Sequence, residues 1–481
     1  MSRERYKSDD LRQDRIPKSV AGGGLGRSSE EASVTGVERR AKHLPSGEST
    51  TTSSGRKFRH RKIDWHRTRG CISLTPKHFL DAYRKVRRNG GSAGVDGQRI
   101  QDFADDLTTN LFTLWNRVSS GAYHPPAVRR VGILKDDGRL RYLGIPTVSD
   151  RIVQQVIKDW IEPRLEAIFC DTSYGYRPGR SAHDALQVVR LDVRKASWVI
   201  DLDVASFFDE LPHGLLRKAL DRHVPEGWIR RLLDRWLEAP IKETESGELV
   251  YRRGRGTPQG GVISPLLANL YLHYVLDKWL AKHHSDVQLV RYADDAVIVC
   301  KSRQRAEWLR EQLDARFRDC GLRLHPEKTK VVFCKRADRT SVHDQITFDF
   351  LGYRFQPCTK RRHDGRLFTS YDCRMSPKSC KKAIAKLRSI KFHRWVSAEI
   401  DDIANALNPM LRGLLNYFGK FNPGRGLDHV MHAVNDRLAK WVGRKYKKVG
   451  RSPRRAWRWL YSEAERRPKL FAHWEAGFSR A

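Results

Sequence analysis

Several common sequence features are missing from this chain of 481 residues. Its eight cysteines include no C-x-x-C pair, which argues for a reducing compartment and against a zinc ribbon. No apolar run is long enough to span a bilayer. The charged N-terminus also lacks the apolar core of a signal peptide. We therefore expect an intracellular, cytoplasmic protein with no membrane partner.

A cysteine and histidine cluster offers little evidence for a bound metal. Cys358, Cys373 and Cys380 lie in one part of the sequence, with His343 and His363 nearby. Their spacing fits none of the common zinc-ligand patterns. These residues are therefore not expected to form a metal site.

Acidic residues are also scarce, with 56 Asp and Glu against 92 Lys and Arg, which gives a formal net charge of +36. Such an excess destabilises a compact chain by self-repulsion unless a polyanion neutralises it. Nucleic acid is the expected partner, because phosphate contacts dominate its binding. A membrane surface is the alternative, but no long basic amphipathic segment stands out.

The beginning of the chain is nearly free of aromatic residues and rich in Gly, Ser, Thr, Arg and Glu. Such a segment cannot bury enough apolar area to offset the entropy of ordering. We expect a flexible basic tail over residues 1–70. The remaining length is sufficient for two or three domains.

Apolar spacing predicts several helices after the tail. One begins at Thr75, and a second covers about 102–118. From Ser376 onward the pattern is that of basic helices, one of them interrupted at Pro409, and their aligned apolar stripes suggest a small bundle.

Two acidic segments are the first chemical signal. Arg291-Tyr292-Ala293-Asp294-Asp295 lies between two short apolar, β-branched runs, which predicts a β-hairpin with two carboxylates at its tip. Adjacent carboxylates repel unless a cation lies between them, and Mg²⁺ prefers such oxygen ligands. A solvated Asp-Asp turn is the alternative. Upstream, Asp201 and Asp203 lie two apart on a predicted strand and therefore on one face. A third carboxylate from this strand would complete a two-metal site.

Four other segments have the composition of nucleotide or nucleic-acid contacts. A predicted hairpin over 128–146 carries Lys135 and Arg141, which could clamp a triphosphate or simply be solvated. The loop 174–181 combines two tyrosines with Arg177 and Arg180. The glycine-rich loop 254–261 includes Gln259, although such a loop is also a plain connector. The stretch 441–481 holds twelve Lys or Arg against three Glu, interleaved with aromatic residues, which favours a nucleic-acid surface.

As an ordered set, these blocks resemble a group II intron-encoded reverse transcriptase with its maturase region. The resemblance covers nearly everything from about 75 to 475. The motifs that carry it are Gly94-Val95-Asp96-Gly97, Leu143-Gly144-Ile145-Pro146-Thr147 with Asp150-Arg151, Tyr174-Gly175-Tyr176-Arg177-Pro178, the Asp203 to Asp209 block, Thr257-Pro258-Gln259-Gly260-Gly261, Tyr292-Ala293-Asp294-Asp295, Phe350-Leu351-Gly352-Tyr353, Asn408-Pro409-Met410-Leu411-Arg412-Gly413 with Asn416-Tyr417-Phe418, and Leu470-Phe471-Ala472-His473-Trp474.

This resemblance implies an α+β fold, the right-hand polymerase. It places the fingers with an N-terminal extension at 71–195 and the palm with its catalytic Asp residues at 196–356. An α-helical thumb, or maturase X domain, with a basic end that binds DNA and RNA, is placed at 376–481. The chain stops soon after Trp474, so by this likeness we expect no HNH endonuclease, and either a borrowed primer or the use of single-stranded targets.

The resemblance also implies a set of functional residues. Asp203 is the first metal ligand, because the aromatic Phe208 follows it at the family spacing, and Asp201 is then a neighbour. The further ligands to two Mg²⁺ ions are the carbonyl of Val204, then Asp294, with Asp295 supporting. Phe208 resembles the steric gate against the ribose 2′-hydroxyl. The other nucleotide-binding residues implied are Lys135, Arg141, Gln259 and Lys328, and the RNA- or DNA-binding ones are Arg177, Arg180, Arg412, Lys445, Lys447, Lys448, Arg454 and Arg455.

The function implied is that of an RNA-directed DNA polymerase of a mobile group II intron. It would bind its intron RNA as a maturase in a ribonucleoprotein, promote splicing, and support retrohoming by target-primed reverse transcription. Its partners would be intron RNA, target DNA and deoxynucleoside triphosphates, in a bacterial cytoplasm or at the nucleoid. Two alternatives stay open: a splicing cofactor without polymerase activity, and a host-defence or diversity-generating reverse transcriptase.

Overall fold

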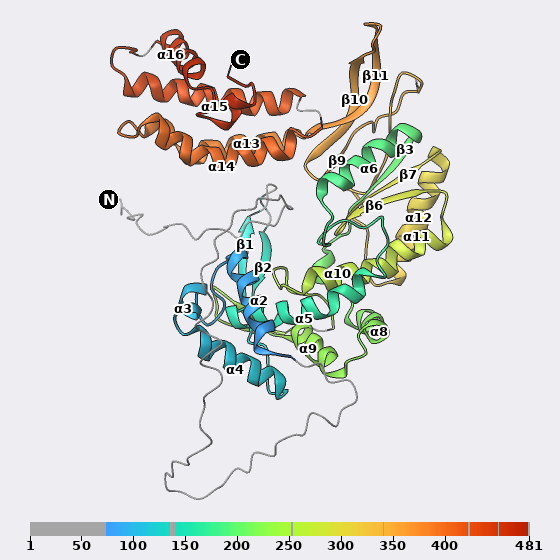
Figure 1. The fold of residues 1–481 in the computed structure, drawn as a ribbon. Helices are drawn as coiled ribbons and strands as arrows, with labels where there is room; N and C mark the ends of the chain where they lie inside the picture. Colours follow the sequence, from blue (N-terminus) through green and yellow to red (C-terminus); the bar gives the residue numbers. More distant parts are fainter. Residues whose placement is uncertain are drawn as a thin grey trace, which may run out of the picture.

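The computed structural model describes residues 74–134, 138, 140–251, 254–339, 341–421, 424–450 and 452–479. The predicted tail over 1–70 lies outside this range. Along the chain, the described residues form an N-terminal helical region, a central sheet with its helices, and a group of C-terminal helices (Figure 1).

The N-terminal region consists of α2 (Pro76–Asn89), α3 (Ile100–Asp105), α4 (Leu107–Ser119) and α5 (Val148–Glu166). The helix predicted from Thr75 is confirmed and buries its apolar stripe of Phe79, Tyr83 and Val86. The single helix predicted over 102–118 is wrong. Asp106 has φ −126° and ψ 57°, which is outside the helical region, and it divides the segment into α3 and α4.

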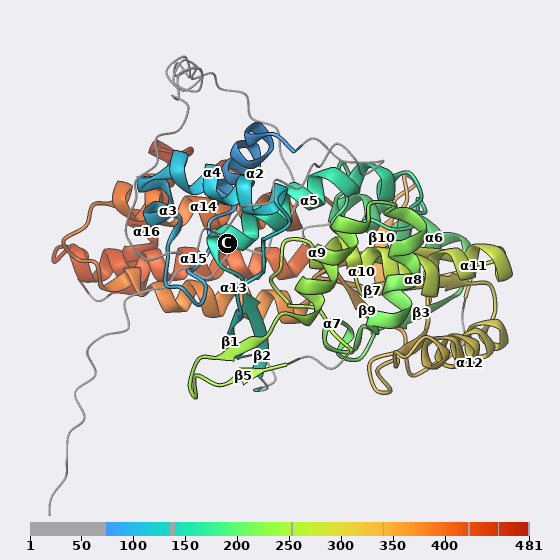
Figure 2. The same cartoon turned by 90° about the horizontal axis from the view of Figure 1, so that it is seen from below.

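A small four-stranded sheet with the order β2-β1-β4-β5 adjoins these helices and projects from one side of them (Figure 2). The predicted hairpin is present as β1 (Val128–Leu134) and β2 (Leu140–Ile145), paired antiparallel. Strands β4 (Ile241–Glu243) and β5 (Leu249–Val250) extend it, with β4 parallel to β1.

The central sheet is antiparallel, with the order β6-β7-β3-β8. Its strands are β3 (Trp198–Leu202), β6 (Gln288–Tyr292), β7 (Asp295–Cys300) and β8 (Lys330–Phe333). Alternate residues point to opposite faces, and both faces are buried. Ile200 and Ile298 belong to one hydrophobic core, whereas Val199 and Val297 belong to another. This double burial explains why apolar residues occupy neighbouring positions of these strands rather than only every second one.

The central part of the chain also contains several helices. They are α6 (Ala182–Lys195), α7 (Phe207–Glu210), α8 (His213–His223), α9 (Gly227–Glu238), α10 (Ser264–Leu272), the π-helix η2 (His273–Asp277), α11 (Lys278–His283) and α12 (Arg303–Asp319). Helix α6 contacts β6, β7 and β11 (Leu367–Met375), and α12 contacts β3, β7 and β8. The strands β3 and β7, which have the acidic residues at their ends, are therefore held in place by helices packed against them.

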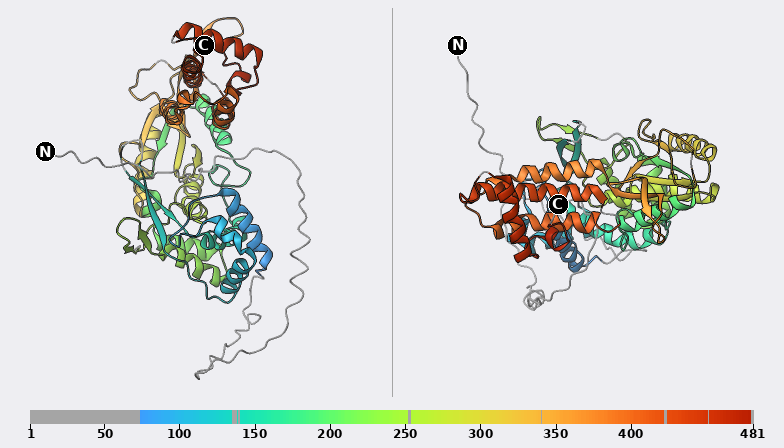
Figure 3. Two further views of the ribbon diagram at one scale, coloured as in Figure 1. Left: turned by 90° about the vertical axis from the view of Figure 1, so that its left-hand side faces the viewer. Right: turned by 90° about the horizontal axis from the view of Figure 1, so that it is seen from above.

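A second sheet with the order β11-β10-β9 leads to the C-terminal helices. Its strands are β9 (Phe348–Phe350), β10 (Tyr353–Arg361) and β11 (Leu367–Met375). The helices that follow are α13 (Pro377–Ile390), η3 (Phe392–Arg394), α14 (Ile400–Phe418), α15 (Gly424–Lys445), α16 (Pro453–Arg466) and α17 (Ala472–Glu475). The three long helices α13, α14 and α15 lie side by side when the molecule is seen from above (Figure 3, right).

The predicted interruption at Pro409 is wrong, because α14 runs through it without a break. A proline removes one backbone hydrogen bond and leaves the carbonyl four residues earlier, that of Asn405, without its partner. Both Pro409 and Asn405 are exposed on the solvent side of the helix, so water can hydrate that carbonyl. In the part of the chain that the structure describes, no helix combines the length and apolar character needed to cross a bilayer.

Candidate active site

The acidic turn, residues 292–295, connects β6 to β7. Tyr292 pairs with Asp295 across the hairpin, so Ala293 and Asp294 form a two-residue connection. Ala293 has φ +58°, a left-handed conformation that a residue with a side chain adopts only under constraint. The structure thus contains the hairpin expected from the sequence, with both carboxylates at its end.

Asp203 reaches the acidic turn from the neighbouring strand. Leu202, the last residue of β3, pairs with Ala296, so Asp203 follows the strand on the side of Asp295. The backbone carbonyl of Asp203 accepts hydrogen bonds from the His325 amide, at 2.8 Å, and from the Thr329 hydroxyl, at 3.2 Å. Two segments that are far apart in sequence therefore place their carboxylates at the same end of one sheet.

Burial and mutual repulsion perturb these carboxylates. Although the Asp295 residue is in part exposed to solvent, its pKa is raised to about 7, first by burial of the carboxyl group and then by the charges of Asp294 and Asp203. Burial also raises the pKa of Asp294, with Arg141 opposing and Asp203 reinforcing the shift. The pKa of Asp201 rises to about 8, through burial first and then through Asp295 and Asp203. Carboxylates that repel one another in this way form one negative site.

The chemistry of this site fits a hard divalent cation, because carboxylate oxygens and a backbone carbonyl are the donors that such ions take. The Nζ of Lys328 lies 3.4 Å from Asp203 Oδ2. Within the described ranges, however, no three His, Cys, Asp or Glu side chains are gathered closely enough to form a metal-binding group. Joint metal binding by Asp203, Asp294 and Asp295 stays a prediction. Among the described residues, Cys358, Cys373 and Cys380 likewise belong to no metal-binding group of three such side chains, and all three are free thiols.

A buried clamp of Arg291, Asp277 and Asn269 supports the acidic turn. The Arg291 guanidinium is fully buried and donates to Asp277, with Nε 2.7 Å from Oδ1 and Nη2 2.5 Å from Oδ2. Its Nη1 donates to Asn269 Oδ1, at 2.9 Å, and to the carbonyl of Ala293, at 2.8 Å. Ala293, the strained residue of the acidic turn, is therefore held by the guanidinium of Arg291, whose charge is neutralised by Asp277.

The same clamp holds a second strained loop against the turn. The Asn269 amide donates to the carbonyl of Gly175, at 2.7 Å. A Cβ on Gly175 would lie 2.4 Å from the Ala293 nitrogen, so only glycine permits this approach. The next residue, Tyr176, has φ +58° and is half exposed. The charge of Asp294 contributes, after burial, to the raised pKa of this tyrosine.

The sequence interpretation missed Asn269 and Asp277. One signal was available: Arg291 follows the apolar pair Leu289-Val290 on a strand, and a charged residue buried there requires an acidic partner. The acidic partner could not be found from the periodicity of an α-helix, because Asp277 lies in a π-helix, which has wider turns. Such wide turns are rare and occur frequently at functional sites.

The predicted nucleotide-binding residues of the small sheet and the glycine-rich loop lie together. Arg141 Nε donates to Gln259 Oε1, at 2.7 Å, and the Gly144 amide donates to the Gln259 carbonyl, at 2.9 Å. A Cβ on Gly260 would lie 2.4 Å from the Gly144 oxygen, which explains a glycine with φ +135° at that position. Phe208 is buried on α7, and its carbonyl accepts from the Thr257 amide. Lys135 lies outside the described residues.

The predicted nucleic-acid contacts differ in their accessibility. Arg177 is buried, donating to Glu166 and to the carbonyls of Cys170 and Ser173, and so fixes the shape of its loop. Arg180 pairs with Asp171, at 2.5 Å, and Lys445 donates to Glu399, at 2.7 Å. The remaining predicted residues are exposed: Arg412, Lys447, Lys448, Arg454 and Arg455.

Two family models match the chain in succession. Residues 133–355 match the model described as reverse transcriptase (RNA-dependent DNA polymerase), and residues 380–461 match the group II intron, maturase-specific domain. Among solved structures, apo telomerase from Candida tropicalis, truncated from its C-terminal domain, gives a TM-score of 0.39 at 15% identity, covering 52% of this chain and 58% of that one.

Two curated proteins are similar to this chain. The chain is 34% identical over 318 residues to protein YkfC of Escherichia coli K12, covering 58% of this chain and 80% of the relative. It is 32% identical over 210 residues to the group II intron-encoded protein LtrA of Lactococcus lactis subsp. cremoris, covering 43% of this chain and 34% of LtrA. With an RNA-directed DNA polymerase domain followed by a maturase domain, the chain belongs to the group II intron-encoded reverse transcriptases.

Proposed function

We propose that this chain copies RNA into DNA at the acidic turn and also binds a group II intron RNA as its maturase. In this proposal it promotes splicing and supports retrohoming by target-primed reverse transcription. The observation that supports the polymerase role is the strand register, by which Asp203, just after β3, lies at the same end of the central sheet as Asp294 and Asp295. We place the fingers at 71–195, the palm at 196–356 and the thumb, or X domain, at 376–481.

The proposed cofactor is a pair of Mg²⁺ ions, held by Asp203, Asp294, Asp295 and the carbonyl of Val204. When bound, such ions would activate a primer hydroxyl and neutralise triphosphate charge. The chain's own residues position the reactants. Arg141, held by Gln259, faces the triphosphate, and Lys328 is placed beside Asp203 to meet the pyrophosphate. Phe208 excludes the ribose 2′-hydroxyl from a deoxynucleotide site.

The maturase role rests on the C-terminal match and on charge. The maturase-specific model covers 380–461, which favours intron RNA over a host-defence or diversity-generating role. Arg412, Lys447, Lys448, Arg454 and Arg455 are exposed there and suited to phosphate contacts. We further propose target DNA as a second partner and a cytoplasmic location, with the nucleoid as the place of action on DNA.

Primer extension on poly(rA) annealed to oligo(dT) tests the polymerase role. Asp294→Asn removes one carboxylate charge at nearly constant size, and DNA synthesis should become undetectable while RNA affinity stays nearly unchanged. Asp319→Asn removes the same charge at an exposed position on α12 and should leave synthesis intact. Normal extension by the Asp294 variant would overturn the assignment of the site.

A splicing cofactor without polymerase activity is the second candidate. The observation that favours it is that the described residues hold no three-residue metal-binding group and that Lys328 lies beside Asp203. The two candidates differ in one measurement. A wild-type protein that binds intron RNA tightly but extends no primer, with Mg²⁺ in excess, would select the cofactor.

A further inference from the structure

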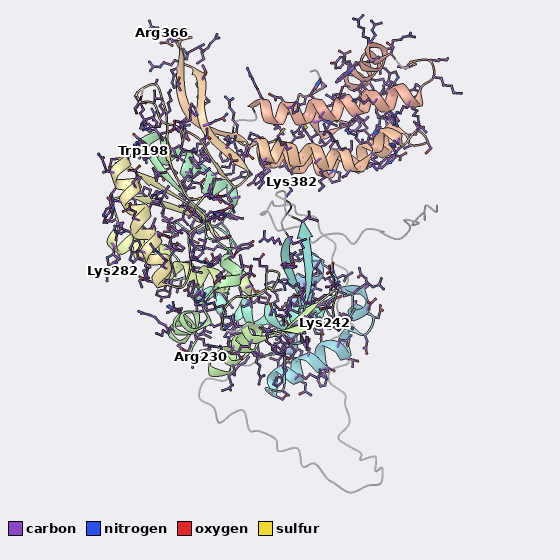
Figure 4. All side chains as sticks on the ribbon, turned by 180° about the vertical axis from the view of Figure 1, so that it is seen from behind. Trp198, Arg230, Lys242, Lys282, Arg366 and Lys382 are labelled. Carbon is purple, nitrogen blue, oxygen red and sulfur yellow. The ribbon has the colours of Figure 1, made fainter. Side chains whose placement is uncertain are left out.

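The hairpin of β10 and β11 is longer than the core that supports it. Nine residues of each strand pair, from Tyr353 with Met375 to Arg361 with Leu367. Near its base, Tyr353, Phe355 and Tyr371 are fully buried. The outer part, residues 359–369, is called here the hairpin tip. It rises beyond α6 and the central sheet in Figure 1 and in Figure 3 (left), with Arg366 labelled at its end in Figure 4.

The stem of this hairpin is fixed to α6 by a buried ion cluster. Asp372 on β11 is fully buried and accepts from Arg190 on α6, with Nε 2.5 Å from Oδ1. Lys360, the residue just before the exposed arginines, also donates to Asp372. Since both partners are anchored at the same carboxylate, the tip is presented in a fixed direction rather than on a loose loop.

The tip itself carries positive charge with little compensation. Arg361, Arg362 and Arg366 are exposed, and the Asp364 carboxylate lies 4.0 Å from Arg366. The strands close through a turn in which the Gly365 amide donates to the Arg362 carbonyl. Next to them Leu367 is 67% exposed, so no core covers this end of the hairpin. Three guanidinium groups therefore project from one small rigid element.

Other basic residues continue this charge toward the central sheet. Arg194 and Lys195 at the end of α6 are exposed or half-exposed, and Arg336 donates to the Arg194 carbonyl. Arg336 lies in the loop that follows β8. The backbone of this loop is bonded to the hairpin, because the Ala337 amide donates to the Thr369 carbonyl at 2.9 Å.

This surface lies at the opposite end of β3 from the acidic turn. Trp198, labelled near the foot of the hairpin in Figure 4, begins β3, and Asp203 follows its other end. Five strand residues separate the two by about 16 Å, and the tip extends further away. A nucleic acid bound at the tip is therefore outside the polymerase site.

We propose that the hairpin tip binds the phosphate backbone of folded RNA through Arg361, Arg362 and Arg366, at a site separate from the polymerase site. The identity of the ligand as RNA rests on the proposed function. Guanidinium groups make paired hydrogen bonds to phosphate oxygens, and three of them on a rigid support lose little entropy on binding. The tip would thus hold the body of the parent RNA while the acidic turn acts on a template strand.

Protection of a sheet edge is the competing explanation. Strand β11 is an edge strand, and charged residues on edges prevent pairing with other chains. Such protection needs charges along the exposed edge. Here they gather at the turn, beyond the last buried residues of the stem, which favours a ligand.

The test compares two triple variants with equal loss of charge. Arg361→Gln, Arg362→Gln and Arg366→Gln change the tip, whereas Lys282→Gln, Lys301→Gln and Arg310→Gln change exposed residues of α11, the loop after β7, and α12. The probe is a short RNA stem-loop, added to full-length protein that already holds a chain-terminated poly(rA)–oligo(dT) duplex. Anisotropy over a series of KCl concentrations gives the affinity and its salt dependence.

The tip variant should bind the stem-loop about tenfold or more weakly, and the slope of log K against log salt should fall by about 2 to 3, since each lost phosphate contact removes roughly 0.9. The control variant should match wild type, and primer extension should be normal in both. Equal slopes for the two variants would overturn the proposal, as would a tip variant that aggregates while its monomeric fraction binds the stem-loop normally. If wild type extends no primer, the polymerase proposal fails separately, because stem-loop binding is measured without extension.

Discussion

Two hairpins in this molecule use arginine in opposite ways. In the hairpin of β6 and β7, Arg291 is fully buried and directs one donor at the backbone of the acidic turn. In the hairpin of β10 and β11, Arg361, Arg362 and Arg366 are exposed at the turn itself. The difference shows how burial selects a role. A guanidinium enclosed with its carboxylate positions backbone, and one that faces solvent is available to a partner.

The carboxylates that accompany these arginines differ in the same sense. Asp277 and Arg291 both have side chains with no exposure. Asp372 is equally buried, but its partners Arg190 and Lys360 keep 21% and 31% of their side-chain exposure. Loss of Asp277 would therefore leave the buried charge of Arg291 without a partner. Loss of Asp372 would leave Arg190 and Lys360 with charges that water can still hydrate. Substitutions at the two clusters should therefore differ in how much unfolding free energy they remove and in whether they abolish primer extension.

The largest effect is expected at Arg291. Arg291→Met leaves Asp277 buried without its cation, which should cost about 3–5 kcal/mol of unfolding free energy in urea and abolish primer extension. Adding Asp277→Leu should restore much of the stability. Activity should stay lost, because the Ala293 carbonyl still lacks its charged donor. A stable double variant with wild-type kcat would show that the buried clamp serves folding alone.

A smaller and pH-dependent effect is expected at Asp372. Burial alone would raise the pKa of this carboxyl, but hydrogen bonds from Arg190 and Lys360 outweigh burial and hold the pKa at about 2. A lowered pKa stabilises the fold above the pKa of the unfolded state, near 4, and that contribution disappears as the pH falls through 2. Asp372→Asn should thus cost about 2 kcal/mol at neutral pH.

The check on Asp372 is its pH profile. Urea unfolding of wild type and variant should converge as the pH is lowered from about 4 to about 2. A constant difference between them across that interval would mean that packing, rather than charge, explains the loss. Primer extension on poly(rA) annealed to oligo(dT) should be normal in this variant, unlike in Arg291→Met.

The smallest effect is expected at the glycine of the hairpin tip. A Cβ on Gly365 meets no atom within 4 Å, so Gly365→Ala suffers only the strain of φ +81°, about 1 kcal/mol. The matched substitution Gly175→Ala has the opposite character, because its Cβ meets the acidic turn at 2.4 Å. It should reduce kcat strongly with a modest change in melting temperature. Equal kcat values for the two variants would contradict the difference drawn between the hairpins.

Local patterns predicted much of the frame. The apolar runs around Asp294 and Asp295 indicated the hairpin of β6 and β7, and the segment 197–204 indicated the strand that leads to Asp203. The predictions were wrong where the conformation of a single residue decides whether a helix ends or continues. Asp106 divides a helix whose apolar spacing continues across it, and Pro409 is accepted within α14 because its side of the helix faces water.

Arginine is where sequence reasoning reached its limit. Arg177 was predicted to contact nucleic acid, yet it is buried and bonded to Glu166, whereas Arg366 attracted no notice and lies at an exposed tip. Nothing local distinguishes them, because a guanidinium is suited equally to a buried carboxylate and to a phosphate.

The sequence by itself determined the strands and helices, the excess of positive charge and the order of motifs, since each depends on neighbours within a few residues or on a simple sum. Only the tertiary structure decided which charges are enclosed. Arg291 meets Asp277 and Asn269 across a π-helix, and Asp372 meets Arg190 across two elements. Whether a charge is neutralised inside the protein or presented to a ligand depends on what packs over it, and packing joins segments whose separation along the chain has no fixed period.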